Sequence, residues 1–158
     1  MKQIPLTKGM VATVSNQWFK KLSKVKWYAQ KCGLHYYAAR RDRAGRLILM
    51  HRVIMGATAR QVVDHRDLCG LNNLRRNLRL ASHSQNHGNQ KKYSGRFTSR
   101  FKGVCRSNAN DYNPWIAYIT VDSKRRYLGY HSTPEKAARA YNKAARHLFG
   151  PFALLNLV

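Results

Sequence analysis

The chain has 158 residues, which is room for one ordinary domain or two small ones. A hydrophobic content of 44% argues against global disorder. Lys and Arg number 30 against 6 Asp and Glu, and the formal net charge of +24 requires a polyanionic partner. Nucleic acid is the expected partner, and an anionic membrane surface is the alternative. A transmembrane protein is excluded because no run of about 18 apolar residues occurs, and the N-terminal residues lack the apolar stretch of a signal peptide.

The three cysteines, Cys32, Cys69 and Cys105, are odd in number and form no CxxC pair. This argues for a reducing compartment, and against both a disulfide framework and a four-cysteine zinc site.

Residues 1–50 predict a small strand-rich unit with one short helix. Ser15 can cap that helix, which carries Trp18, Phe19 and Leu22 at helical spacing. Four runs have the composition of strands: residues 10–14 and the segments KWYAQ, HYYAAR and RLILMH. Residues 51–60 then predict a short helix that ends at Gly56.

The segment VDHRDLCGLNNLRRNLRLASHSQNHGN carries two of the six acidic residues, Asp64 and Asp67. A carboxylate beside a histidine suits phosphodiester hydrolysis, because a hard divalent cation takes oxygen ligands and an imidazole can activate water. Ser82 and Gln85 have capping-box spacing, so a helix should begin near His83. That helix would carry Asn86 in its first turns, facing back toward Asp64 and His65.

This pattern resembles the HNH endonucleases, specifically the homing-type members encoded by phages. The matching residues are Asp64-His65, Asn77, and Asn86 nine residues later. The resemblance implies a ββα-metal element in which His65 is the general base and Asn77 orients it. It also implies that Asp64 and Asn86 bind one metal ion, Mg²⁺ or Mn²⁺. Asn in place of His at the third motif position suits a hard metal better than zinc.

Other interpretations of the same residues stay open. Asn72, Asn73 and Asn77 could be turn residues. Four side chains, in a His-x3-Cys…His-x3-His arrangement, have nearly the spacing of a zinc finger: His65, Cys69, His83 and His87. A zinc site would leave Asp64 and Asn86 without a role.

Residues 99–158 predict three antiparallel strands followed by one helix. In WIAYITV, Trp115, Ala117, Ile119 and Val121 share one face, and Tyr118 lies on the other. A turn at residues 122–124 leads into the return strand RRYLGYH. Thr133 can cap the final helix, with Pro134 at its first position, and Gly150 ends it. The helix would cover one face of the sheet and leave a basic, aromatic face open.

From Ser99 onward the sequence resembles the AP2 domain of plant transcription factors and phage homing endonucleases. The matching segments are SRFKGV, WIAYI and YLGYHSTPEKAARAYNKAARHLFGPFALLN. The resemblance implies that the open sheet face lies in the major groove. Candidate DNA contacts are Lys102, Gly103, Tyr118, Arg125 and Tyr127. Cys105 and Thr120 stand where plant members carry arginines, and Arg106 is the candidate to compensate. The alternative for the tyrosines is cross-strand packing.

The predicted fold class is α+β, with a nuclease domain at 1–90, a basic linker at 91–98 and an AP2-like domain at 99–158. The predicted function is metal-dependent cleavage of double-stranded DNA by a homing-type HNH endonuclease, at a site chosen partly by its AP2-like domain. The predicted location is the cytoplasm, that of a bacterial host if the chain is phage-encoded. No membrane or protein partner is implied. The rivals are a non-enzymatic DNA-binding regulator, with a structural zinc or a degenerate HNH module, and an RNA-binding accessory protein. We also expect residues 1–90 alone to cut DNA slowly.

Overall fold

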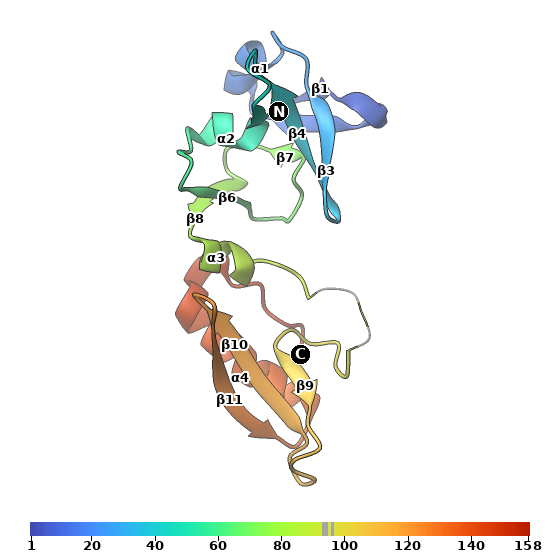
Figure 1. Cartoon of the computed structure of the whole chain (residues 1–158), viewed down its shortest axis with the longest axis vertical. Helices are drawn as coiled ribbons and strands as arrows, with labels where there is room; N and C mark the ends of the chain where they lie inside the picture. The colour runs from blue at the N-terminus through green and yellow to red at the C-terminus, as the bar shows by residue number, and fades with distance from the viewer. Residues whose placement is uncertain (93–94, 96) are drawn as a thin grey trace. The chain divides into compact units, whose positions relative to one another are not determined.

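The structure is a computed structural model that describes residues 1–92, 95 and 97–158. It is mixed α+β, with several small sheets and few helices, and it forms two compact units, Met1–Ser82 and His83–Val158 (Figure 1). The division falls earlier in the chain than the predicted boundary after residue 90, so the helix that carries Asn86 belongs to the second unit. Residues 93, 94 and 96 of the predicted linker lie outside the described residues.

The first unit contains two three-stranded sheets and a two-stranded ribbon. One sheet has the order β1-β2-β7, from Lys2–Pro5, Val11–Val14 and Asn72–Asn73, with β7 parallel to β2. The other has the order β3-β4-β5, from Tyr28–Cys32, His35–Arg41 and Leu47–Leu49. The antiparallel ribbon joins β6, Val62–His65, to β8, Leu78–Ala81. Two short helices, α1 at Asn16–Leu22 and α2 at Met50–Met55, complete the unit, together with a 3-10 turn at Thr7–Gly9.

The core of the first unit is formed by residues from nearly every element. Its buried members are Ile4, Ala12, Val14, Leu22, Trp27, Ala38, Met50, Ile54, Val63 and Leu78. The last two come from the β6–β8 ribbon, so the ribbon is fixed to the core by one of its faces. The predicted strands and the helix ended by Gly56, in the left-handed conformation, are confirmed. Ser15 does precede α1, but its side chain makes no cap; its hydroxyl accepts from the backbone N–H of Arg75 instead (3.2 Å).

The second unit is a three-stranded antiparallel sheet with a long helix on one face (Figure 1). The strands are β9, Val104–Arg106, β10, Trp115–Val121, and β11, Lys124–His131, in the order β11-β10-β9. The long helix is α4, Pro134–Phe149, followed by a 3-10 turn at Gly150–Phe152. The short helix α3, His83–Gly88, begins where the capping-box spacing predicts. No helix of the described residues is long and apolar enough to cross a bilayer.

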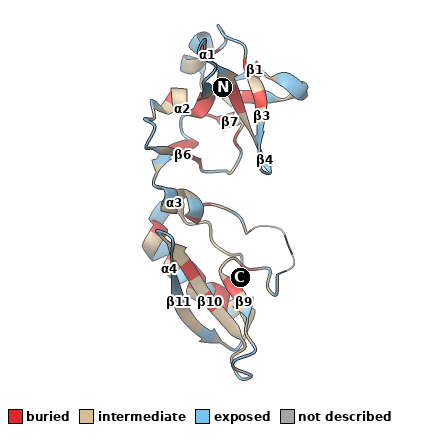
Figure 2. Ribbon diagram, in the orientation of Figure 1, coloured by how far each residue is buried: buried red, intermediate tan, exposed pale blue. Residues whose placement is uncertain are grey.

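Helix α4 packs on the sheet through alanines, which let the two backbones approach closely, and through two aromatic rings. Ala137, Tyr141, Ala145 and Phe149 are buried, and so are Ala117 and Ile119 of β10 on the facing side of the sheet (Figure 2). The helix begins as predicted, because the Thr133 hydroxyl accepts from the backbone N–H of Lys136 (3.2 Å) and Pro134 occupies the first turn. On the opposite face of the sheet, Tyr118 and Thr120 are half-buried, and Arg125 and Tyr127 are exposed.

Candidate functional site

The β6–β8 ribbon holds Asp64 in a buried ion pair. Asp64 lies directly opposite Arg79 in the antiparallel register, so both side chains project from the same face. Arg79 Nε donates to Asp64 Oδ2 over 2.6 Å, and the two residues are 8% and 4% exposed. The bonded guanidinium restricts the rotation of the carboxylate. Asp64 is therefore held in one orientation, and carboxylate oxygens are ligands that a hard divalent cation takes.

His65 is the next residue on β6, so its side chain projects from the opposite face, together with Leu78. It is 6% exposed, and its ring lies among aromatic neighbours: the ring centroids of His51 and Tyr37 are 5.0 and 5.8 Å away. His65 Nε2 lies 3.4 Å from Asn73 Oδ1. Donation from Nε2 to that oxygen places the lone pair of the imidazole on Nδ1.

The protonation state of His65 follows from its burial. Burial lowers the pKa of His65, although the bond to Asn73 and the charges of Asp67 and Asp64 act in the other direction. The same cause lowers the pKa of the neighbouring His51 to about 3. Both rings are therefore neutral at neutral pH. A neutral imidazole is what a general base must be before it accepts a proton.

Asn77 braces the loop that follows His65. Its Nδ2 donates to Asp67 Oδ1 and to the Asn72 carbonyl, both over 2.8 Å, and its Oδ1 accepts from the Asp67 N–H (3.2 Å). Burial raises the pKa of Asp67, but hydrogen bonds from the Cys69 N–H, Asn72 and Asn77 outweigh it and lower the pKa overall. These contacts fix the backbone immediately after His65. Asn77 thus acts on His65 through the loop.

Asn86 lies on α3 and hence in the second unit, whereas Asp64, His65 and Asn77 lie in the first. The four residues of the zinc alternative divide in the same way, with His65 and Cys69 in one unit and His83 and His87 in the other. Among residues 1–92, 95 and 97–158, no group of three or more His, Cys, Asp or Glu side chains is gathered as a metal site. Cys69 is exposed.

The open sheet face of the second unit carries Tyr118, Arg125 and Tyr127. Tyr118 lies opposite Tyr127, and Thr120 lies opposite Arg125, so these side chains share one face. The guanidinium of Arg125 lies over the Tyr118 ring, 4.4 Å from its centroid. Tyr127 is 58% exposed and packs edge-on against Tyr130. Both the cross-strand packing and the exposure expected of a contact face are therefore present.

Lys102, Gly103 and Arg106, the other predicted DNA contacts, have contacts or positions that differ from those expected of residues on the open sheet face. Lys102 Nζ donates to the carbonyls of His87, Gly88 and Gln90 at 2.8 to 3.1 Å, and burial lowers the pKa of Lys102 to about 8. Gly103 has a φ of +71°, and a Cβ there would lie 2.2 Å from the Tyr141 ring.

Arg106 is exposed but lies opposite Trp115, on the side of the sheet that packs against α4. The register thus separates Arg106 from the face that carries Tyr118.

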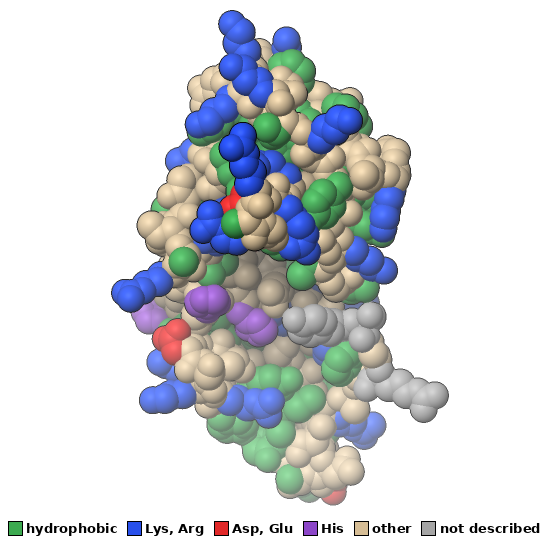
Figure 3. Space-filling view, turned by 45° about the horizontal axis from the view of Figure 1, so that its top comes forward, with side chains coloured by type: hydrophobic (Ala, Val, Ile, Leu, Met, Phe, Trp, Pro, Cys, Tyr) green, Lys and Arg blue, Asp and Glu red, His purple; other side chains and the backbone are tan. Residues whose placement is uncertain are grey.

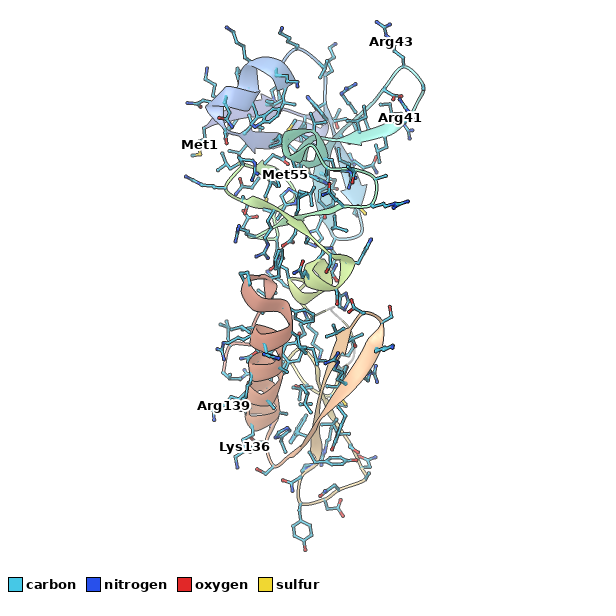
Figure 4. The ribbon with its side chains drawn as sticks, turned by 90° about the vertical axis from the view of Figure 1, so that its left-hand side faces the viewer. Met1, Arg41, Arg43, Met55, Lys136 and Arg139 are labelled. Atoms are coloured by element: carbon cyan, nitrogen blue, oxygen red, sulfur yellow. The ribbon has the colours of Figure 1, made fainter. Side chains whose placement is uncertain are left out.

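Basic side chains occur well beyond the predicted contact face. Lys and Arg are spread over the visible surface of the first unit (Figure 3). In the second unit, Lys136 and Arg139 project from α4 on the side away from the sheet (Figure 4). Such a distribution attracts a polyanion from many directions, so affinity alone does not identify the specific face.

The chain is 34% identical, over 157 residues, to an uncharacterized HNH endonuclease of Acanthamoeba polyphaga mimivirus. This match covers 96% of the chain and 77% of the viral protein. The chain belongs to the HNH endonuclease family.

Two other matches cover a smaller share of this HNH endonuclease. The chain is 51% identical over 45 residues to a dehydration-responsive element-binding protein of Oryza sativa, covering 27% of the chain and 14% of that protein. It is 43% identical over 58 residues to an ethylene-responsive transcription factor of Arabidopsis thaliana, covering 35% and 30%. These matches support an AP2-like region in the chain. No family profile and no solved structure matches.

Sequence reasoning missed three of the residues that shape the site. Asn73 was predicted at most as a turn residue, yet it is fully buried and contacts His65. Arg79 and His51 received no role, although Arg79 pairs with Asp64 and the ring of His51 lies edge-on to that of His65. Arg79 could have been predicted as the partner of Asp64 by pairing residues 62–65 with residues 78–81 as an antiparallel ribbon. That register places Asp64 and Arg79 opposite each other.

Proposed function

We propose that this HNH endonuclease cleaves double-stranded DNA in a metal-dependent reaction. The observation that carries the proposal is the ribbon β6–β8, which presents an ion-paired Asp64 beside a buried, neutral His65 in a chain of charge +24. A carboxylate and an imidazole on one short strand are the groups that hydrolysis of a phosphodiester needs. The basic surfaces of both units favour a polyanionic substrate.

In this proposal, His65 is the general base. With Nε2 held by Asn73 Oδ1, Nδ1 takes a proton from the attacking water, and Asp67 and Asp64 stabilise the imidazolium that forms. Asn77 keeps the loop after His65 rigid, so that the ring does not rotate away. His65 and Asn77 are thus a base and its positioning residue.

The oxygen donors of Asp64 and Asn86 fit Mg²⁺ or Mn²⁺, because hard cations prefer carboxylate and amide oxygens. A bound divalent ion would supply positive charge to the phosphate as negative charge develops in the transition state. Arg79 holds the Asp64 carboxylate in a fixed orientation for that ion. The thiol and imidazoles of the zinc alternative offer a softer set in which Asp64 has no part.

DNA binding is proposed for the open face of the second unit. Tyr118, Arg125 and Tyr127 form a continuous aromatic and cationic surface on β10 and β11. An arginine held over a tyrosine ring keeps an extended, oriented guanidinium that can reach base edges or phosphates. Lys102, Gly103 and Arg106 are not part of this surface, and we propose structural roles for the first two.

The test is cleavage of supercoiled plasmid by the purified chain with Mg²⁺, with Mn²⁺, with Zn²⁺ and with chelator. We expect nicked or linear product with the first two ions and none with chelator. Asp64→Asn should abolish cleavage, and the matched variant Asp111→Asn, in an exposed loop, should cleave like the wild type. Binding without cleavage under every condition would instead favour the non-enzymatic DNA-binding regulator.

A further inference from the structure

Helix α3 carries the third motif residue, Asn86, and is built into the DNA-binding unit. The last carbonyls of any helix lack partners within the helix. Here the ammonium of Lys102 donates to the last two carbonyls of α3, with Nζ 3.1 Å from that of His87 and 2.9 Å from that of Gly88. It also donates to the carbonyl of Gln90, just after the helix, over 2.8 Å. A cation at a helix C-terminus is also favoured by the helix dipole.

Lys102 is itself fixed on both sides of its backbone by one residue, Asn156. The Lys102 N–H donates to Asn156 Oδ1 (2.7 Å), and Asn156 Nδ2 donates to the Lys102 carbonyl (3.0 Å). Asn156 is in turn bonded to the buried Asn142 of α4, with Asn142 Nδ2 donating to the Asn156 carbonyl (2.9 Å) and the Asn156 N–H donating to Asn142 Oδ1 (2.8 Å). A continuous hydrogen-bonded path therefore joins α4 to the end of α3.

Other contacts hold α3 against the same unit. Gly88 packs so closely on Phe149 that a Cβ would lie 2.7 Å from its ring. The Leu154 N–H donates to the Gly88 carbonyl (3.1 Å). At the first turn of α3, the Ser84 hydroxyl accepts from the N–H of Asp122, in the turn between β10 and β11 (3.1 Å). The first turn of α3 is thus tied to the turn between β10 and β11, and its C-terminal end to α4, to the segment after α4 and to Lys102.

The geometry of Lys102 also argues against the phosphate contact that the AP2 resemblance implies. An ammonium group has three N–H donors. Three backbone carbonyls lie within hydrogen-bonding distance of this one, which accounts for all of them. A phosphate oxygen could bind Lys102 only by displacing the end of α3.

We propose that Lys102, set in place by Asn156, is a positioning residue that fixes α3, and with it Asn86, to the DNA-binding unit. The proposal rests on the proposed function, in which Asn86 is a metal ligand. Loss of the Lys102 contacts should therefore loosen the helix that carries the proposed metal ligand Asn86.

The experiment compares Lys102→Met and Lys102→Arg with the wild type and with Lys143→Met, which removes the same charge from an exposed site on α4. Hydrogen exchange should quicken about tenfold or more in the peptide covering α3, because charged hydrogen bonds at its end are lost, while α4 stays protected. Lys102→Arg should behave similarly, since a planar guanidinium does not match three carbonyls that converge on a compact ammonium. Lys143→Met should leave α3 unchanged.

Two functional readouts complete the comparison. The Mn²⁺ concentration that gives half-maximal cleavage should rise about tenfold in both Lys102 variants, as is typical when a support of a metal ligand is removed. Duplex affinity in chelator should fall no further than in Lys143→Met. Unchanged exchange in α3, with weaker DNA binding and a log–log salt slope smaller by about 0.9, would overturn the proposal and mark Lys102 as a phosphate contact.

The exchange measurement separates this proposal from the proposed function. If the wild-type chain cleaves no duplex with any divalent ion, the proposed function and the metal half of this proposal are both refuted. The exchange of α3 would still decide whether Lys102 holds the helix.

Discussion

The protonation of His51 offers a quantitative test of the packing around the candidate base. His51 is 6% exposed, and among the described residues its Nδ1 has no hydrogen-bond partner. Burial, then the nearby His65 and Arg52, lower the pKa of His51 from 6.5 to about 3. A depressed folded pKa contributes stability in full above the unfolded value, and this stability is lost as pH falls from 6.5 toward 3.

The magnitude follows from linkage. Each pH unit within that window costs about 1.4 kcal/mol per titrating group, so lowering the pH from about 7.5 to about 4.5 should cost about 2.7 kcal/mol through His51 alone. His51→Phe keeps an aromatic ring but removes the titration. The variant should therefore lose less stability in acid than the wild type.

The assay is urea denaturation at about pH 7.5 and about pH 4.5, read by pulsed hydrogen exchange in the peptides of β4 and α2. These peptides report the first unit separately from the second. His65, whose pKa is lowered for the same reason, continues to titrate, so the slope should shrink rather than vanish. An acid dependence in His51→Phe equal to that of the wild type would refute a neutral, buried His51.

Three further predictions concern the second unit. Arg125→Ala should weaken duplex binding by about 1–3 kcal/mol and relax preference at one base pair if Arg125 contacts a base. Competition binding with randomised duplexes measures both effects. The control Arg139→Ala, on α4, should lose affinity equally for all sequences. Gly103→Ala should lower the melting temperature by the equivalent of about 1–3 kcal/mol, because its positive φ and its contact with Tyr141 leave no room for a methyl group. Thr133→Ala should cost about 1 kcal/mol in the same melt, through loss of the cap of α4; no change would show that the cap contributes nothing.

Elements with strong local signals could be predicted from the sequence. The cap, first-turn proline and terminal glycine gave α4 its bounds, and strict alternation gave β10 its two faces. Other elements have no local signal. Strand β7 is only Asn72–Asn73, and it pairs in parallel with β2, a strand far away in the chain. Strand β1 contains Pro5 and was not predicted, because proline lowers strand propensity outside an edge.

The site shows the same division between local and distant information. The adjacency of Asp64 and His65 is a property of the chain, but the partners of each are set by folding. Arg79 meets Asp64 through the pairing of β8 with β6, and Asn73 reaches His65 from strand β7. Lys102 illustrates the limit most clearly. The sequence shows only that a lysine stands where AP2 domains contact DNA, and a lysine can bind either a phosphate or the end of a helix. The three carbonyls around Nζ show that this lysine binds the end of a helix.

The expectation that residues 1–90 would cut DNA on their own follows from a boundary drawn by sequence. Such a fragment contains Asn86 but ends before Lys102, Phe149 and Asn156. Since Lys102 and Phe149 contact α3, and Asn156 holds Lys102, the fragment would lack the support of its third motif residue. The proposed role of Lys102 therefore predicts an inactive fragment, and a cleavage assay on residues 1–90 decides between this and slow cutting.

The most direct test of the central claim is metal-dependent cleavage by His65→Ala. His147→Ala, at an exposed position of α4, is the matched control, and duplex binding in chelator shows whether each variant still recognises DNA. The account predicts that His65→Ala binds DNA like the wild type but cleaves at least about a hundredfold more slowly with Mg²⁺, the range expected for loss of a general base. Cleavage by His65→Ala at the rate of the wild type and of His147→Ala would contradict it.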